Sequence, residues 1–167
     1  MILDIVKVPN EILKTPALPV DKFDGEIEEL IKNLLETMNS NDGAGLAAPQ
    51  IGVSKQVLVF NEYKTEVEEG YDFVTKIPHA LINPRITWES KYKLREAWEG
   101  CLSIPDVEYK VTRPVKIKVA SFIYKDNDFV LGELEADGMM ARTIQHELSH
   151  LKGILISDMS HAWRVRE

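Results

Sequence analysis

Cysteine is nearly absent from this sequence, since Cys101 is the only one among 167 residues. A single thiol excludes an internal disulfide framework. It leaves Cys101 either as a small buried hydrophobic residue, which is the commoner role of a lone cysteine, or as a reactive or metal-bound group. The sequence around Cys101 therefore has to decide between these roles.

Long apolar runs are absent as well. No stretch approaches the ~20 apolar residues that a membrane-spanning helix requires. Residues 1–13, MILDIVKVPNEIL, lack both the apolar core of a signal peptide and the Arg/Ser bias of a transit peptide. These absences predict a cytoplasmic protein without a membrane partner.

Positive charge is in deficit, with 20 Lys and Arg against 27 Asp and Glu, and a formal net charge of -7. The basic residues are scattered, so the sequence offers no basic groove for a nucleic acid. With 44% hydrophobic and 28% charged residues, the composition is that of an ordinary globular protein. We expect one domain covering residues 1–167, acting as a monomer.

Hydrophobic periodicity predicts the elements of the first half of the chain. Residues 24–39 place apolar side chains at helical spacing, which predicts an amphipathic helix. Residues 43–52, GAGLAAPQIG, predict a glycine-rich loop, and residues 56–60 a short strand. Residues 64–76 have no clear period, so we expect a long surface loop there.

The second half has the β-branched and alternating character of strands. Residues 79–88, 107–114 and 115–124 are predicted strands, and the last of these returns through a hairpin turn into residues 130–137. A helix over residues 138–152 follows. This order predicts an α+β fold, with antiparallel β-sheets packed around a central helix.

That helix contains the motif QHELSH, in which His146 and His150 lie four residues apart and Glu147 follows the first histidine. Because successive helical residues advance by about 100°, both imidazoles point the same way, opposite an apolar stripe of Met140, Ile144, Leu148 and Leu151. In an H-E-x-x-H site the two rings bind one metal ion, and the carboxylate lies beside a metal-bound water. The competing interpretation is a solvated helix face that happens to contain two histidines.

The third ligand of such a site is not fixed by the motif. A zincin would need a glutamate about twenty residues downstream, where only the terminal Glu167 is present, and a metzincin would need a histidine where Ile156 stands. Asp158 and His161 are downstream candidates without a suitable spacing. Cys101, within EGCLS, is the better candidate, and a Cys–His–His set would leave a fourth position for water.

The motifs GAGLAAPQ (43–50), EGCLS (99–103) and QHELSH (145–150), in this order, resemble those of the peptide deformylases. The resemblance implies removal of the formyl group from the N-terminal methionine of nascent peptides, near the ribosomal exit tunnel. It also implies one divalent metal ion, usually Fe²⁺. Zn²⁺, Ni²⁺ and Co²⁺ suit the same thiolate and imidazole ligands.

The resemblance assigns roles to individual residues. Cys101, His146 and His150 would be the metal ligands and Glu147 the general base and acid. The Gln50 amide and the Leu102 backbone N–H would stabilise the oxyanion. Substrate-binding residues would be Ala44, Gly45, Gly100, Met139, Arg142 and Thr143. The rival hypotheses are an HExxH metalloprotease that cleaves internal peptide bonds, and a peptide- or ribosome-binding module without activity.

Three features depart from the family pattern. Ser149 replaces a common aspartate, so the hydrogen bonds of that aspartate must come from elsewhere. Arg142 replaces an apolar residue one turn before His146. We expect its stem to border the pocket, with Glu108 as one possible partner, or its side chain to turn outward to solvent. Only 17 residues follow His150, as in a minimal form such as a phage encodes.

Overall fold

The computed structural model describes all 167 residues, Met1–Glu167. Its helices are α1 (Gly25–Ser40), α2 (Gly138–Leu151) and the single turn α3 (Ile156–Met159), with 3₁₀ turns at Glu11–Lys14 and Ala48–Ile51. Its strands are β1 (Gly45–Ala47), β2 (Val57–Glu68), β3 (Tyr71–Glu89), β4 (Leu94–Cys101), β5 (Ile104–Pro114), β6 (Lys116–Lys125), β7 (Asp128–Asp137) and β8 (Trp163–Val165). None of the helices is both long and apolar enough to cross a membrane.

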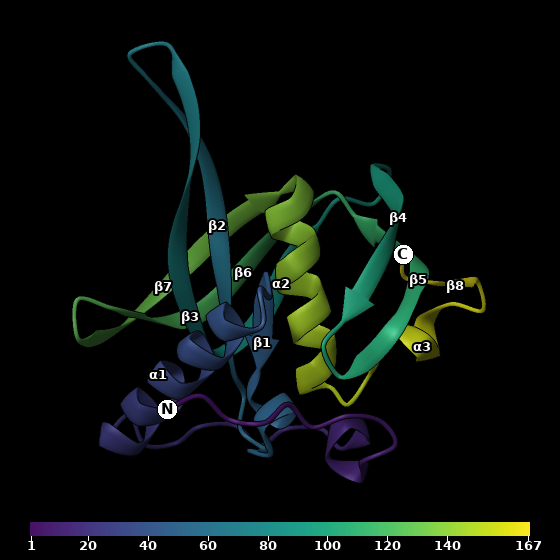
Figure 1. The fold of residues 1–167 in the computed structure, drawn as a ribbon. Coiled ribbons are helices and arrows are strands. Elements are labelled where there is room, and N and C mark those ends of the chain that lie inside the picture. The colour runs from purple at the N-terminus through teal and green to yellow at the C-terminus, as the bar shows by residue number, and fades with distance from the viewer.

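The strands form two antiparallel sheets. One has the order β1-β2-β3-β6-β7 and the other the order β4-β5-β8. Helix α2 lies between them and contacts β1 and β2 of the first sheet and β5 of the second (Figure 1). The predicted α+β fold, with antiparallel sheets around the helix that contains the HExxH motif, is confirmed.

The buried face of α2 explains why this helix is central. Ala141, Ile144, Leu148 and Leu151 pack into one core cluster with apolar side chains of β2, β3 and β6, and Met140 packs against the same cluster. Helix α1 covers a second cluster that includes side chains of β1 and β2. Because its apolar stripe is anchored on the large sheet, the opposite face of α2 is turned toward the small sheet.

The ends of the helices follow from local chemistry. Asp24 caps α1, and its carboxylate accepts hydrogen bonds from the N–H groups of Glu26 and Ile27. Asp137 precedes α2 without a side-chain capping bond. Gly153 follows the α2 C-cap with φ +71°, and a Cβ at this position would lie 2.6 Å from the Lys14 carbonyl oxygen. Glycine is therefore required where the chain leaves α2.

The predicted surface loop at residues 64–76 is wrong. These residues belong to the long hairpin of β2 and β3, paired from Val57–Ile82 to Glu68–Tyr71, which projects beyond the rest of the molecule (Figure 1). Both faces of its tip meet solvent, so no alternation of buried and exposed residues marked it as a strand. Strands β4 and β8 were not predicted, and residues 43–52 contain β1 and a 3₁₀ turn in place of a continuous loop.

Candidate active site

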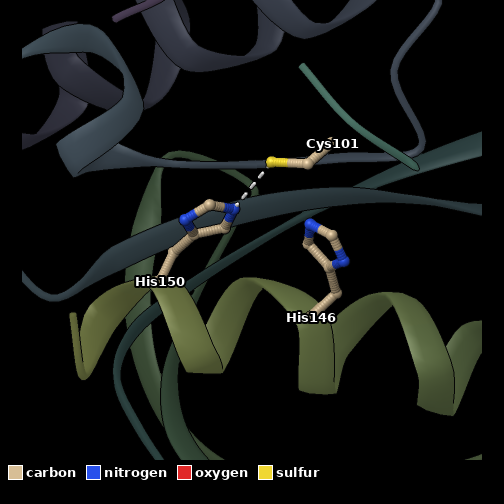
Figure 2. Close-up of side chains that lie close together, drawn as sticks. All are labelled: Cys101, His146 and His150. Carbon is tan, nitrogen blue, oxygen red and sulfur yellow. Dashed lines mark hydrogen bonds between the residues drawn. The ribbon is translucent and has the colours of Figure 1, made fainter. Parts of the chain in front are cut away.

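Three ligand atoms converge between α2 and the end of β4. Those of Cys101, His146 and His150 all lie within 4.8 Å of one another. The Cys101 sulfur is 3.3 Å from His150 Nε2, and both histidines reach toward it from successive turns of α2 (Figure 2). Cys101 and His150 are almost fully buried. The structure thus brings together the two histidines and the cysteine favoured from the sequence.

The downstream alternatives do not join this group. The Asp158 carboxylate pairs with Lys14 and caps the turn at Leu155, and His161 is exposed. Ile156 is buried in the apolar cluster beneath β5. Cys101 reaches the histidines because the pairing of β4 with β5 shifts register between Gly100 and Cys101, at the turn that joins the two strands.

Glu99 holds the first histidine in place. Its Oε1 atom lies 2.9 Å from His146 Nδ1, which leaves Nε2 of that ring for a metal. Arg113 donates two hydrogen bonds to the same carboxylate, at 2.7 and 2.9 Å. Burial raises the pKa of Glu99, but the hydrogen bonds from His146 and Arg113 outweigh this effect and lower it to about 2. Glu99 is therefore a fixed negative charge behind the histidine.

Arg142 is the third side chain that contacts the Glu99 carboxylate. Its guanidinium donates to Glu99 Oε2, to the Val111 carbonyl at 3.0 Å and to the Arg95 carbonyl at 2.6 Å. Only 7% of the residue is exposed. The expectations of Glu108 as a partner and of an outward rotation are both wrong, because the carboxylate of Glu99 lies buried within reach and Glu108 faces the C-terminal strand.

Glu147 is a buried carboxyl group with one unpartnered oxygen, Oε2. Burial raises its pKa to about 7, although the positive charges of His146 and Arg113 act in the opposite direction. The group lies against Gly45, where an added Cβ would be 2.7 Å from Glu147 Oε1. A glycine in β1 therefore makes the space in which this carboxylate lies.

The two histidines differ in their surroundings. Burial lowers the pKa of His146, but the nearby Cys101 sulfur and Glu99 raise it overall, to about 10. Burial moves the pKa of His150 well below its ordinary value, and His150 Nδ1 has no hydrogen-bond partner. Ser149 does not supply one, since its hydroxyl donates to the Gln145 carbonyl within α2. The hydrogen bond that orients His146 comes from Glu99, whereas the contact of His150 is between its Nε2 atom and the Cys101 sulfur.

A cavity of about 440 Å³ opens beside these groups. Glu147, Gln50 and Leu102 line it. The six residues expected to bind substrate all line it too, namely Ala44, Gly45, Gly100, Met139, Arg142 and Thr143. All the residues that the resemblance named, except His150, therefore line one space.

The Gln50 side chain is fixed in this wall. Its Oε1 atom accepts from the Ala47 N–H at 3.0 Å, and its Nε2 atom donates to Ser103 Oγ at 3.1 Å. The same Nε2 lies 3.7 Å from the Cys101 sulfur. These contacts orient the donor side of the amide toward the ligand cluster.

Several cavity residues were missed from the sequence. Asn41, Asp42, Trp98, Glu99 and Arg166 also line the space. Glu99 belongs to the EGCLS motif and lies two residues before Cys101, so its position in the sequence could have identified it as a cavity residue. Arg166 lies 65 residues beyond Cys101, and nothing in the local sequence links the two.

The residues present fit a divalent ion. Two imidazoles and one thiol form a donor set that suits Zn, Fe, Co or Ni, and three ligands leave a further coordination position open. The unpartnered Oε2 of Glu147 is a buried acceptor without a donor, as expected for a group that hydrogen-bonds a water molecule at that position.

Known proteins resemble the chain over nearly its whole length. A family model described as Polypeptide deformylase matches residues 2–164. A peptide deformylase of Salinibacter ruber is 39% identical, covering 99% of this chain and 84% of the relative. The structure of a probable peptide deformylase from Synechococcus phage S-SSM7 has a TM-score of 0.80 at 37% identity, covering 94% of this chain and 99% of that one. A Met-Ala-Ser-bound class I type b peptide deformylase from Acinetobacter baumannii has a TM-score of 0.81 at 29% identity, covering 95% and 98%. This chain belongs to the polypeptide deformylase family.

Proposed function

We propose that this protein hydrolyses the formamide of N-formylmethionyl peptides, releasing formate and a peptide with a free amino terminus. The observation that carries the proposal is the buried Cys101–His146–His150 cluster, with Glu147 beside it, at the wall of a cavity open to solvent. Cys101, His146 and His150 would hold a divalent ion, and such an ion would supply Lewis-acid activation of a water molecule and lower its pKa toward neutrality.

Glu147 moves the proton. Its raised pKa of about 7 suits a group that accepts a proton from water and then delivers it to the departing amine at neutral pH. The buried Oε2 atom has no hydrogen-bond partner within the protein, so it is free to accept that proton. Glu99 keeps the His146 imidazole in position, and Glu147 is the next residue of α2. The position of the Glu147 carboxylate relative to that imidazole is therefore set by the helix.

Gln50 and Leu102 stabilise the oxyanion in this proposal. The Gln50 amide is locked by Ala47 and Ser103, with its donor side toward Cys101. Leu102 follows Cys101 directly and lines the same cavity, so its backbone N–H is the second donor we assign. Losing one oxyanion donor typically costs about 3 kcal/mol of transition-state stabilisation, which would make Gln50 nearly as important as a ligand.

The substrate peptide lies extended between two segments of main chain. Residues 43–45 and residues 100–102 both line the cavity. The three glycines and the alanine among these residues allow a peptide to approach as an added strand. A Met-Ala-Ser peptide is bound in the A. baumannii relative, and a tripeptide of this kind is the ligand we propose for this cavity.

Turnover of formyl-Met-Ala-Ser by anaerobically prepared protein tests the function, with casein as the control substrate. We expect formate release from the first and no cleavage of the second. The reverse result would support an internal metalloprotease, and the absence of both would support a binding module. Metal analysis of this protein, together with activity per equivalent of Fe²⁺, Zn²⁺, Ni²⁺ or Co²⁺, tests the native ion, for which we propose Fe²⁺.

We also propose where in the cell the protein acts and in which oligomeric state. Nascent chains present their formyl group at the ribosomal exit, so we place the enzyme in the cytoplasm, acting as a monomer on chains near the exit tunnel. Co-sedimentation with purified ribosomes and sedimentation velocity of the free protein test these two points.

A further inference from the structure

The C-terminal strand brings a positive charge to the cavity. Strand β8 pairs with β5 through Val107–Val165, Glu108–Arg164 and Tyr109–Trp163. The pairing continues one step further, because the Arg166 N–H donates to the Asp106 carbonyl at 2.9 Å. The backbone of Arg166 is therefore fixed beside the segment that follows the metal-ligating cysteine.

The Arg166 guanidinium lies directly over Gly100. A Cβ at position 100 would collide with the Arg166 Nη2 atom, so the guanidinium could not keep this position over any other residue. Arg166 lines the active-site cavity and also the adjoining depression, which share Cys101 and Leu102 as walls. It thus lies where one space passes into the other, on the route by which a bound peptide would leave the site.

The donors of this guanidinium are largely unused. Its nearest acidic group is Glu108, with Nε 4.0 Å from Oε1, and the structure gives the side chain no hydrogen bond within the protein. Glu108 is shared with Arg164, which lies 3.3 Å from Oε2. An arginine head with free donors, held by its backbone at the mouth of a peptide-binding cavity, is suited to bind an oxygen acceptor of the ligand.

We infer that Arg166 is a substrate-binding residue whose guanidinium donates to a main-chain carbonyl of the peptide beyond its first methionine. The inference rests on the proposed function, because it assigns the direction in which the peptide leaves the formyl-binding end. The acceptor must lie at the second or third residue, since the first is held next to Cys101, His146 and Glu147. A carbonyl is present in every nascent chain, whereas a free carboxylate is not.

Steady-state kinetics of Arg166→Ala test the inference. The substrates are formyl-Met-amide, formyl-Met-Ala-Ser and formyl-Met-Ala-Ser-amide. We expect KM to rise about 10-fold for both tripeptides, kcat to stay within twofold, and the formyl-Met-amide values to be unchanged. The magnitude is the lower end of the effect of a charge-assisted hydrogen bond, because Arg166 is half-exposed. Arg166→Lys should recover part of the loss.

Arg164→Ala is the matched control. Arg164 lies on the same strand, pairs with the same Glu108 and stacks over the Trp98 ring at 4.4 Å, but it does not line the cavity. We expect its KM values to stay within twofold of those of the unsubstituted protein. Metal content and the urea midpoint are measured for both variants, so that a loss of the strand is distinguished from a loss of binding.

Three results would overturn the inference while leaving the proposed function intact. These are an unchanged tripeptide KM in Arg166→Ala, an equal loss in Arg164→Ala, or an equal loss on formyl-Met-amide. A loss confined to the tripeptide with a free carboxylate would overturn the main-chain assignment and identify the terminal carboxylate as the acceptor. Failure of the unsubstituted, metal-loaded protein to release formate would overturn the proposed function and this inference together.

Discussion

Replacing Arg142 by methionine removes three buried donors while keeping most of the aliphatic stem. The guanidinium of Arg142 donates to Glu99 Oε2 and to the carbonyls of Val111 and Arg95. Methionine fills the space of the stem but leaves these acceptors unpaired. The perturbation is therefore mainly electrostatic, with little loss of packing.

The loss of stability depends on which hydrogen bonds each acceptor retains in the variant. Glu99 retains two hydrogen bonds from Arg113 and one contact to His146, so its negative charge remains compensated. Breaking a buried pair outright costs about 3–5 kcal/mol, and one hydrogen bond to a charged group about 1.5–3 kcal/mol. Arg95 is exposed, so water can satisfy its carbonyl. We expect the free energy of unfolding to fall by about 3 kcal/mol.

Urea unfolding of the metal-free protein measures this change. One cooperative transition is expected for each protein if residues 1–167 form a single domain, with the same m-value for both. Lys110→Met is the matched control, since Lys110 pairs with Glu96 at the surface and an exposed pair contributes about 0–1 kcal/mol. An Arg142→Met variant within 0.5 kcal/mol of the unsubstituted protein would refute the role we assign to the buried cluster.

The same variant should bind metal more weakly. His146 is oriented through Glu99, and loss of such an outer hydrogen-bonding partner typically costs about 10- to 100-fold in metal affinity or activity. Competition with a chelator of known affinity measures it. Unchanged affinity together with lost stability would show that Arg142 supports the fold but does not position the ligand.

Other perturbations test the remaining parts of the site. Glu147→Gln should keep the metal and lose at least ~100-fold in kcat, as expected for loss of general acid–base catalysis; a rate within threefold of the unsubstituted enzyme would remove Glu147 from proton transfer. Cys101→Ala should lose stoichiometric metal by elemental analysis, and full metal content with full activity would show that the site lies elsewhere. The pKa of Glu99 is lowered by folding from 4.5 to about 2, so its stabilisation is present above about pH 4.5 and is lost as the pH falls toward 2. At 1.36 kcal/mol per pKa unit this stabilisation amounts to about 3 kcal/mol. Between pH 4.5 and pH 2, the free energy of unfolding of metal-free Glu99→Gln should therefore fall less than that of the unsubstituted protein. A parallel fall in both proteins would assign the acid sensitivity to other groups.

The sequence predicted α2 and its two faces because helical periodicity is a local property. His146, Glu147 and His150 lie within five residues, so one helical turn determines their relation. Cys101 could be proposed only by weighing candidates, since its approach to α2 depends on the packing of a separate sheet. The three-motif resemblance supplied that long-range information.

Other features were outside the reach of local patterns. The partner of Arg142 could not be identified, and Glu108 was only one candidate, because the sequence does not show that Glu99 is buried between Arg113 and His146. The sequence predicts a loop at the hairpin tip, since strands that pack against no core lack the alternation that identifies them. Arg166 reaches the cavity only because β8 pairs with β5, and the sequence of neither strand predicts this pairing.

The two sheets each end in an edge strand at the cavity, β1 on one side and β4 on the other. Exposed strand edges usually invite unwanted pairing between molecules, and proteins tend to cover or shorten them. Here residues of both edge strands line the cavity, and β1 has only three residues. A bound chain can therefore form only a few main-chain hydrogen bonds before it leaves the molecule. An enzyme built this way tolerates almost any sequence beyond those first residues, which is what a general modifier of protein amino termini requires.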